Sequence, residues 1–314
     1  MDIDLFGNKI NKLEADIVNI YADETQIVKD IITNEKWIYT VAIYEIVNKP
    51  ILNDLINSRY RKELSDWENY FDKNDTEIHW KNIEKDNNKR NIIERWLKYI
   101  IDDCFSDRKF YFSILGINIS NLNTEEFGKK QSFNNIYNRF FRSMLAYSLK
   151  KFFNNGVIVK NIYHERGQQS EHEYFDWHTI FKLNQDEKLN FECEKIKFLP
   201  KSHREDKKSN IIQLCDVLLG IFKDIHLGVN RDTYSQNKKD ILSSNFVNEL
   251  LINRIIKQPW NKASKYGYFN RSQISLFPKE YFSPDSVLRF KDNYYDISKI
   301  DLSYYKSSQL NLSI

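Results

Sequence analysis

One stretch constrains the fold of this chain more than any other. Residues 17–25 read IVNIYADET, an apolar strand pattern that ends in two adjacent acids, Asp23 and Glu24. Side chains alternate on a strand, so one face carries Ile17, Asn19, Tyr21 and Asp23, and the other carries Val18, Ile20 and Ala22. A strand this apolar is expected to be central, and ligands collect at the carboxyl ends of such strands. Because a lone buried carboxylate is costly, Asp23 is predicted to have partners or to bind a cation.

Composition sets broad limits on the protein. A chain of 314 residues can bury a substantial core, as one large domain with additions or as two domains, and its 8 Gly and 5 Pro favour long regular elements. The three cysteines stand singly, which offers no metal knuckle and fits a reducing, cytoplasmic compartment. No long apolar span occurs, so we expect neither secretion nor a membrane anchor. The net charge of +3 neither requires nor excludes a nucleic-acid partner.

Hydrophobic periodicity predicts an α/β protein. Strands are predicted at 17–25, 37–47, 109–120, 157–163 and 189–199, and helices at 53–71, 91–104, 133–153 and 210–224. The aromatic stripe of helix 133–153 is interpreted as core rather than as a base-stacking platform, because it is continuous and helical. Ser209 is predicted to cap the last helix.

That last helix, SNIIQLCDVLLGIF, is the second informative stretch. Asp216 stands among apolar residues that indicate burial on most sides, so its charge needs a partner or a metal ion. Gln213 lies three residues earlier on the same face, and Gly220 leaves room for close approach. The alternative interpretation is a single polar stripe that faces solvent.

Three motifs together resemble a known family. In chain order they are IYADET, the run EIHWKNI that begins at Glu77, and IIQLCDVLLG. They are similar to the "domain of unknown function 3800" family of bacterial proteins, which is assigned to the ribonuclease H-like superfold. The resemblance spans roughly residues 17–222. It implies a mixed five-stranded sheet flanked by helices, over 15–227, with a helical insertion near 53–104.

The resemblance also implies a metal-dependent nuclease-like centre. By position, the carboxylates expected to bind Mg²⁺ or Mn²⁺ are Asp23, Glu77, Glu165 and Asp216. The family usually has Asp in the strand-end slot where this chain has Glu165, so Glu171 and Glu173 are fallbacks. Other residues expected to support the site or contact the substrate are Glu24, His164, Lys201 and Gln213. Two such ions would activate a water molecule and steady the leaving oxygen of a phosphodiester.

Other segments leave alternatives open. Residues 164–178 are rich in His and Glu but lack the H-E-x-x-H spacing, so a solvated loop is favoured over a zinc site. The run KSHREDKK at 201–208 is interpreted as a solvated turn. No nucleophile elbow, Walker loop or dinucleotide-binding loop occurs in the chain.

Residues 228–314 are predicted to be a mostly helical C-terminal extension. They carry 13 Lys and Arg against 8 Asp and Glu, interleaved with aromatic residues. Such a mixture grips single strands, and it also arises where a tail packs back on a domain.

Two functional classes follow from the sequence. The first is a metal-dependent nuclease or related phosphodiesterase. The second is a non-catalytic nucleic-acid-binding or partner subunit that kept the fold, within a defence or mobile-element system. The sequence does not decide between RNA and DNA as the substrate.

Overall fold

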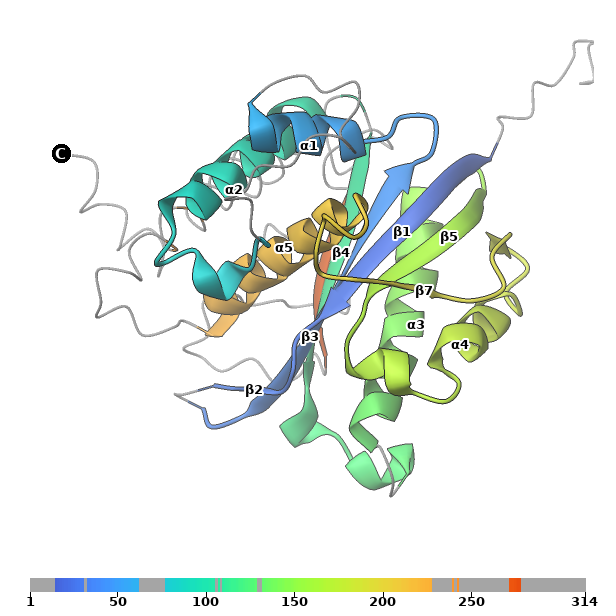
Figure 1. The fold of residues 1–314 in the computed structure, drawn as a ribbon. Coiled ribbons are helices and arrows are strands. Elements are labelled where there is room, and N and C mark those ends of the chain that lie inside the picture. Colours follow the sequence, from blue (N-terminus) through green and yellow to red (C-terminus); the bar gives the residue numbers. More distant parts are fainter. Residues whose placement is uncertain are drawn as a thin grey trace, which may run out of the picture.

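The computed structural model describes residues 15–30, 33–61, 77–104, 107, 109–128, 132–227, 239, 242 and 271–277. These residues form an α/β fold in which one mixed sheet lies between two groups of helices (Figure 1). The α/β class expected from the sequence is therefore confirmed.

Eight strands make up the sheet. They are β1 (Asp16–Glu24), β2 (Val28–Lys29), β3 (Lys36–Ile46), β4 (Phe110–Asn118), β5 (Val157–Glu165), β6 (Asn190–Phe191), β7 (Lys197–Leu199) and β8 (Ser272–Phe277). Their order is β6-β5-β1-β3-β4-β8, with β2 also paired to β3 and β7 to β5. β1 is antiparallel to β3 but parallel to β5. The carboxyl ends of β1 and β5 therefore meet at the same edge of the sheet.

Helices cover both faces of this sheet. The continuous described segments contain five α-helices, namely α1 (Leu52–Tyr60), α2 (Asn87–Tyr99), α3 (Ser132–Phe152), α4 (Phe175–Leu183) and α5 (Ser209–Leu227). Short 3₁₀ turns are η1 (Trp80–Asn82), η3 (Ile119–Asn121), η4 (Thr124–Phe127) and η5 (Gln168–Glu171), and a π turn, η2 (Ile100–Cys104), follows α2. α1, α2 and α5 lie on one face, and α3 and α4 lie on the other (Figure 1).

The two faces of β1 divide as the alternation predicts. Val18, Ile20 and Ala22 are buried in the core on the α3 side, whereas Tyr21 is buried in the core on the α5 side. Asp23 retains 2% of its exposed surface. β1 is therefore covered on both faces and brings a buried acid to its carboxyl end.

Some predicted elements differ from the structure. The sheet has eight strands rather than five. The strand expected at 189–199 is two short strands, β6 and β7, because residues 192–196 between them leave the ladder. The stretch 164–178, interpreted as a solvated loop, contains η5 and the beginning of α4. The Ser209 hydroxyl donates to the Pro200 carbonyl (2.6 Å) and is not the predicted cap. The helix expected at 53–71 begins as α1, and its part beyond 61 lies outside the described residues.

Part of the predicted extension belongs to the sheet. β8 pairs in parallel with β4, and Ile274 and Leu276 are buried in the core on the α5 side. Within the extension that was predicted to be mostly helical, Lys239 and Leu242 are helical, and the other residues between 228 and 270 lie outside the described residues. Residues 228–314 are therefore not wholly a separate appendage, because 272–277 complete the sheet.

Among the described residues, no helix has the length and apolar character needed to cross a membrane.

Candidate functional site

A pocket of about 460 Å³ lies at the shared edge of β1 and β5, beside α5. Its lining contains four acids, Asp23, Glu24, Glu165 and Asp216, together with Lys201. The acids come from the ends of two parallel strands and from a helix that packs across them. Segments far apart in the sequence thus bring their carboxyl groups to one place.

The Asp23 and Glu165 side chains form the centre of this group. Burial raises the pKa of Asp23 well above its usual value, and the adjoining Glu165 raises it further by charge and by a hydrogen bond. The Asp216 and Glu24 charges act in the same direction. A hydrogen bond between two carboxyl groups requires a proton on one of them. The structure therefore favours a proton shared between Asp23 and Glu165.

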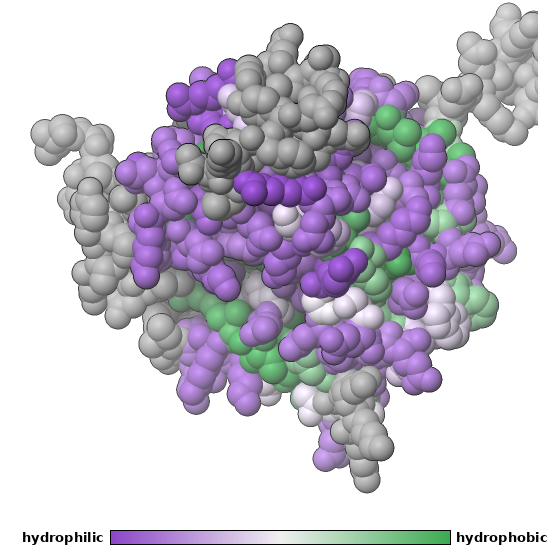
Figure 2. Space-filling view, in the orientation of Figure 1, coloured by the Kyte–Doolittle hydropathy of each residue, from purple (hydrophilic) through white to green (hydrophobic). Residues whose placement is uncertain are grey.

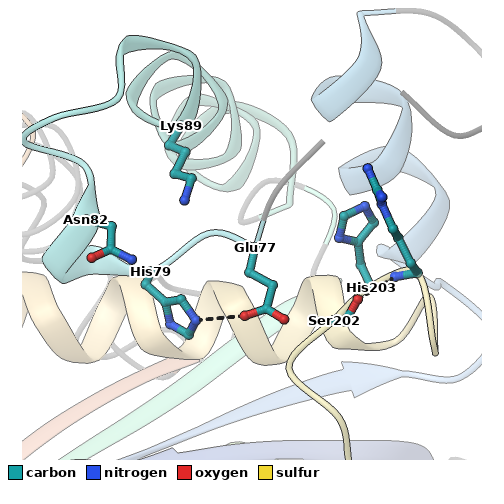
Figure 3. A pocket seen from close by; sticks show the side chains of 7 residues that line it. Glu77, His79, Asn82, Lys89, Ser202 and His203 are labelled. Atoms are coloured by element: carbon teal, nitrogen blue, oxygen red, sulfur yellow. Dashed lines mark hydrogen bonds and ion pairs between the residues drawn. The ribbon is translucent and has the colours of Figure 1, made fainter. Parts of the chain in front are cut away.

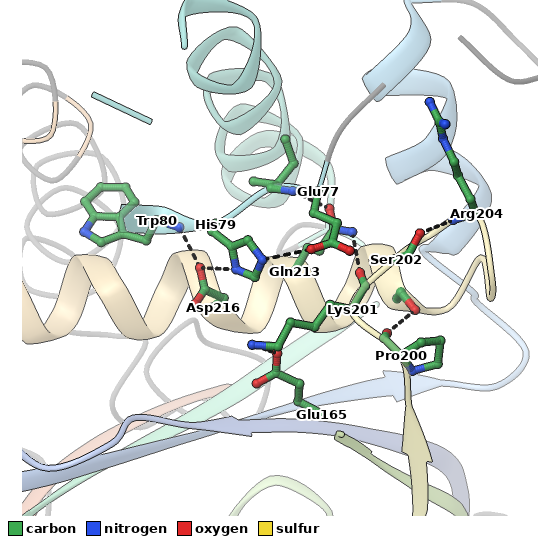
Figure 4. A network of polar contacts seen from close by, with 12 residues as sticks. Glu77, His79, Trp80, Glu165, Pro200, Lys201, Ser202, Arg204, Gln213 and Asp216 are labelled. Atoms are coloured by element: carbon green, nitrogen blue, oxygen red, sulfur yellow. Dashed lines mark hydrogen bonds and ion pairs between the residues drawn. The ribbon is translucent and has the colours of Figure 1, made fainter. Parts of the chain in front are cut away.

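Lys201 is the cation nearest to these acids. Its Nζ lies 2.5 Å from Glu165 Oε1, and Figure 4 shows the two side chains facing one another. Burial acts to lower the pKa of Lys201, but the carboxylates of Glu165, Asp23 and Asp216 outweigh burial, and the net shift is upward. The ammonium group is consequently charged at neutral pH and partly balances the acids.

One face of α5 anchors the EIHW segment. The Asp216 Oδ2 accepts a hydrogen bond from the Trp80 backbone N–H (2.6 Å), and the Gln213 Oε1 accepts from the Ile78 N–H (3.0 Å). The Gln213 amide also donates to the Lys201 carbonyl (2.9 Å) (Figure 4). Asp216 therefore holds the EIHW segment against α5 through its Oδ2. Its side chain is 33% exposed, so it is less buried than its apolar neighbours in the sequence suggested.

Sequence reasoning missed the indole that completes this anchor. The Trp80 Nε1–H donates to Asp224 Oδ2 (2.6 Å), and its ring lies against Gly220 so closely that a Cβ there would meet Trp80 Cγ at 2.1 Å. The room expected at Gly220 is thus filled by an aromatic ring. The available signal was the spacing of Asp216, Gly220 and Asp224 at four-residue steps on one helix face.

Glu77 lies apart from the other three predicted ligands. It lines an adjacent pocket of about 380 Å³ together with Lys89 and His203 (Figure 3), and it is not in the lining of the acid pocket. His79 borders both pockets. Its Nε2 lies 3.2 Å from Glu77 Oε2, and its Nδ1 lies 3.9 Å from Asp216 Oδ2. Interaction with Asp216 raises the pKa of His79, and Glu77 adds to the increase against the opposing effect of burial.

His164 lies beneath the pocket rather than in it. Its Nδ1 is 2.9 Å from the Glu165 carbonyl, which only accepts, so Nδ1 carries the proton and Nε2 accepts from the Tyr137 hydroxyl (2.7 Å). Burial lowers the pKa of His164 to about 4. Glu24 Oε2 lies 3.2 Å from the same Nε2, and burial together with Glu165 raises the pKa of Glu24 to about 8. The contact between Glu24 and His164 thus joins the carboxyl end of β1 to that of β5.

The fallback acids and the remaining histidines do not join this group. Glu171 and Glu173 are exposed and do not line the acid pocket. His172 Nε2 lies 3.3 Å from the Asn138 amide nitrogen, and His178 Nδ1 lies 3.2 Å from Arg142 Nη1. These two histidines are held by different partners.

A metal ion places further demands on the acid pocket. Within the part of the chain that the structure describes, no group of three or more His, Cys, Asp or Glu side chains is gathered closely enough to hold a metal. The donor chemistry nevertheless fits, because Mg²⁺ and Mn²⁺ prefer carboxylate oxygens. The charge also fits. Burial is the main cause of the raised pKa of Asp23, and a cation would relieve the repulsion from Glu165, Asp216 and Glu24 that adds to it. The carboxylates that line this pocket and offer such oxygens include Asp23, Glu165 and Asp216.

No protein-family model, curated protein or solved structure matches the chain.

Proposed function

We propose that this protein is a metal-dependent nuclease or related phosphodiesterase with a ribonuclease H-like fold. The observation that carries the proposal is the set of acids from β1, β5 and α5 that line one pocket beside a lysine. A site of this kind, at the carboxyl ends of parallel strands, is typical of enzymes that bind anionic substrates through a cation.

The donor set suits Mg²⁺ or Mn²⁺ held by Asp23, Glu165 and Asp216. When bound, such an ion supplies a more acidic water molecule and charge stabilisation for a phosphodiester. Asp23 shares its pocket with Glu165, so the two carboxyl groups are suited to hold and release a proton. Lys201 is placed to neutralise a non-bridging oxygen of the substrate phosphate, because its ammonium already lies at the pocket wall.

His79 is suited to act as the general acid. It borders the pocket, and its interactions with Asp216 and Glu77 raise its pKa, which favours the protonated ring near neutral pH. In this role Glu77 orients His79 and does not bind the metal ion. In the reaction, the proton on His79 would pass to the leaving oxygen.

A non-catalytic nucleic-acid-binding subunit is the competing proposal. The Lys201–Glu165 ion pair favours it, since that pair already neutralises one of the acids. The two proposals differ in whether the acids have a chemical task or only a structural one.

The test is the Asp23→Asn variant, which keeps the size of the side chain and removes its charge. Both proteins are incubated with labelled RNA, single-stranded DNA and duplexes in Mg²⁺, Mn²⁺ or EDTA. We expect metal-dependent cleavage by the wild type and a loss of at least about 100-fold in the variant. The matched control is Glu171→Gln, which changes an exposed acid outside the pocket and should cleave normally. Cleavage that continues in EDTA, or equally in Asp23→Asn, would contradict the proposal.

A further inference from the structure

A second surface, away from the acid pocket, exposes large rings. On α4, Trp177 is 50% exposed and Phe181 is 54% exposed, four residues apart and hence on the same side of the helix. Tyr174, just before the helix, is 36% exposed. In Figure 2 a pale to green area lies over α4 at the right of the view, surrounded by purple. We call these three residues and His178 the α4 strip.

The rings of the α4 strip are continuous. The His178 ring centroid lies 5.8 Å from that of Tyr174, 5.6 Å from that of Trp177 and 6.4 Å from that of Phe181. The opposite side of α4, including Phe175, Ile180 and Leu183, is buried in the core on the α3 side. The helix is therefore fixed in place while its aromatic side faces outward.

Cations flank the α4 strip. Lys182 Nζ lies 5.6 Å from the centre of the Phe181 ring, and Arg142 on α3 donates to His178 Nδ1 (3.2 Å). Arg139 lies one helical turn before Arg142. No Asp or Glu oxygen lies within 4.0 Å of these three cations in the described part of the chain. They also affect one another, because the pKa of Arg142 is lowered by burial and then by Arg139.

The α4 strip is connected to the acid pocket by a short path. Gln168 lines the pocket and begins η5, and Tyr174 follows it by six residues, which span at most about 21 Å even when fully extended. Gln169 of η5 lies 3.5 Å from Asn134 in the first turn of α3, so η5, α3 and α4 adjoin one another. A nucleic-acid strand that leaves the pocket along η5 would therefore reach the α4 strip next.

We propose that the α4 strip binds single-stranded nucleic acid, with bases stacked on Trp177 and Phe181 and phosphates neutralised by Arg139, Arg142 and Lys182. Exposed flat rings, beside cations that have no carboxylate partner in the described part of the chain, match a polyanion that carries planar bases. A protein partner would pack on the rings, but it would also have to supply acidic groups to pair with the three cations. The inference rests on the proposed function, which it deepens by naming a single strand as the substrate class.

Binding is measured on the full chain in EDTA, so that it does not depend on cleavage. Fluorescence anisotropy of labelled oligothymidylate is compared with that of an abasic oligonucleotide of the same length. For the double variant Trp177→Ala/Phe181→Ala we expect Kd to rise at least about tenfold on oligothymidylate and to change little on the abasic strand. For Arg139→Ala/Lys182→Ala we expect weaker binding of both strands and a salt slope reduced by about 1.4. The matched controls Ile17→Ala and Lys98→Ala, an exposed apolar and an exposed basic position elsewhere, should bind like the wild type.

Two results would overturn the inference. One is equal binding of oligothymidylate by the wild type and the aromatic double variant. The other is a concentration-dependent dimer in sedimentation that the aromatic variant abolishes without affecting oligonucleotide binding, which would assign the α4 strip to a second copy of the chain. The Asp23→Asn cleavage test is independent of both. If it succeeds while the α4 variants bind normally, the proposed function stands and this inference fails.

Discussion

At the scale of single residues, Glu24 and His164 change the stability of the folded protein with pH in opposite directions. Burial lowers the pKa of His164 to about 4, so its neutral form is favoured and stability is lost as the pH falls below about 6.5. Burial and Glu165 raise the pKa of Glu24 to about 8, so its contribution is full below its unfolded pKa and is lost as the pH rises toward 8. Between pH 4.5 and 6.5 the two effects oppose one another.

Above about pH 6.5 the folded protein still holds protons that the unfolded chain has lost, on the Asp23 and Glu24 carboxyl groups and on the His79 ring. We therefore expect the free energy of unfolding in EDTA to fall between pH 6.5 and 8, by up to about 1.4 kcal/mol per unit for each proton released. Glu24→Gln should make that fall shallower, and Glu171→Gln, at an exposed acid, should leave it unchanged. Urea unfolding at several pH values measures it. A stability that rises steadily from pH 6.5 to 8 would show that Glu24 is not held in its protonated form.

At the scale of elements, the contact between α5 and the EIHW segment fixes the position of Asp216. Alanine in place of glycine inside a helix normally stabilises by about 1 kcal/mol. At Gly220 the new Cβ would meet Trp80 at 2.1 Å, which the ring cannot accommodate without moving. We expect Gly220→Ala to destabilise instead, by about 1–3 kcal/mol, because it overpacks the interface.

A double-mutant cycle separates the helix effect from the contact. In a Trp80→Gly background both the ring and the Trp80 Cβ, which would lie 2.5 Å from the new methyl group, are removed. Gly220→Ala should then become neutral or stabilising. Thermal unfolding of the four proteins gives the coupling energy. If Gly220→Ala has the same effect in both backgrounds, the proposed role of the Trp80–Gly220 contact in holding this segment is wrong.

The elements that the sequence predicted well are those with long, regular patterns. β1, β3, β4 and β5 and helices α3 and α5 follow the expected ranges within a few residues, because each carries an uninterrupted apolar face. α4 was missed because His and Glu are dense around it, and its buried positions Phe175, Ile180 and Leu183 occupy less than three turns. β8 was missed although Ile274 and Leu276 alternate, since the aromatic and basic residues around it suggested an appendage.

The candidate site was predictable in part for the same reason. Asp23 and Asp216 stand out because each interrupts an apolar segment, and Glu165 could be placed because it ends a strand. The position of Glu77 depends on how η1 lies across α5, a contact between segments more than 130 residues apart that no local pattern encodes. The exposure of the aromatic rings on α4 could not be predicted either, since it depends on which side of the helix the rest of the fold covers.

At the scale of the whole molecule, we expect the acid pocket to make the stability of the protein depend on bound divalent cations. The sheet brings acids from residues 23, 24, 165 and 216 to one edge, and Lys201 is the lysine paired with them there. A ligand that binds only the folded state stabilises it by mass action. The pocket should therefore couple divalent-cation binding to global unfolding.

We expect Mg²⁺ or Mn²⁺ to raise the melting temperature of the wild type relative to EDTA. At a concentration of about 100 times Kd the gain is about 2.7 kcal/mol, which corresponds to roughly 4 °C for a chain of this size. Asp216→Asn should retain the Trp80 hydrogen bond through its amide oxygen and lose most of the shift. Glu77→Gln should keep the shift, because Glu77 lines the neighbouring pocket and contacts His79 instead. A shift abolished by Glu77→Gln but not by Asp216→Asn would move the metal site to the neighbouring pocket, and an unchanged melting curve at millimolar metal would contradict a metal centre formed by these acids.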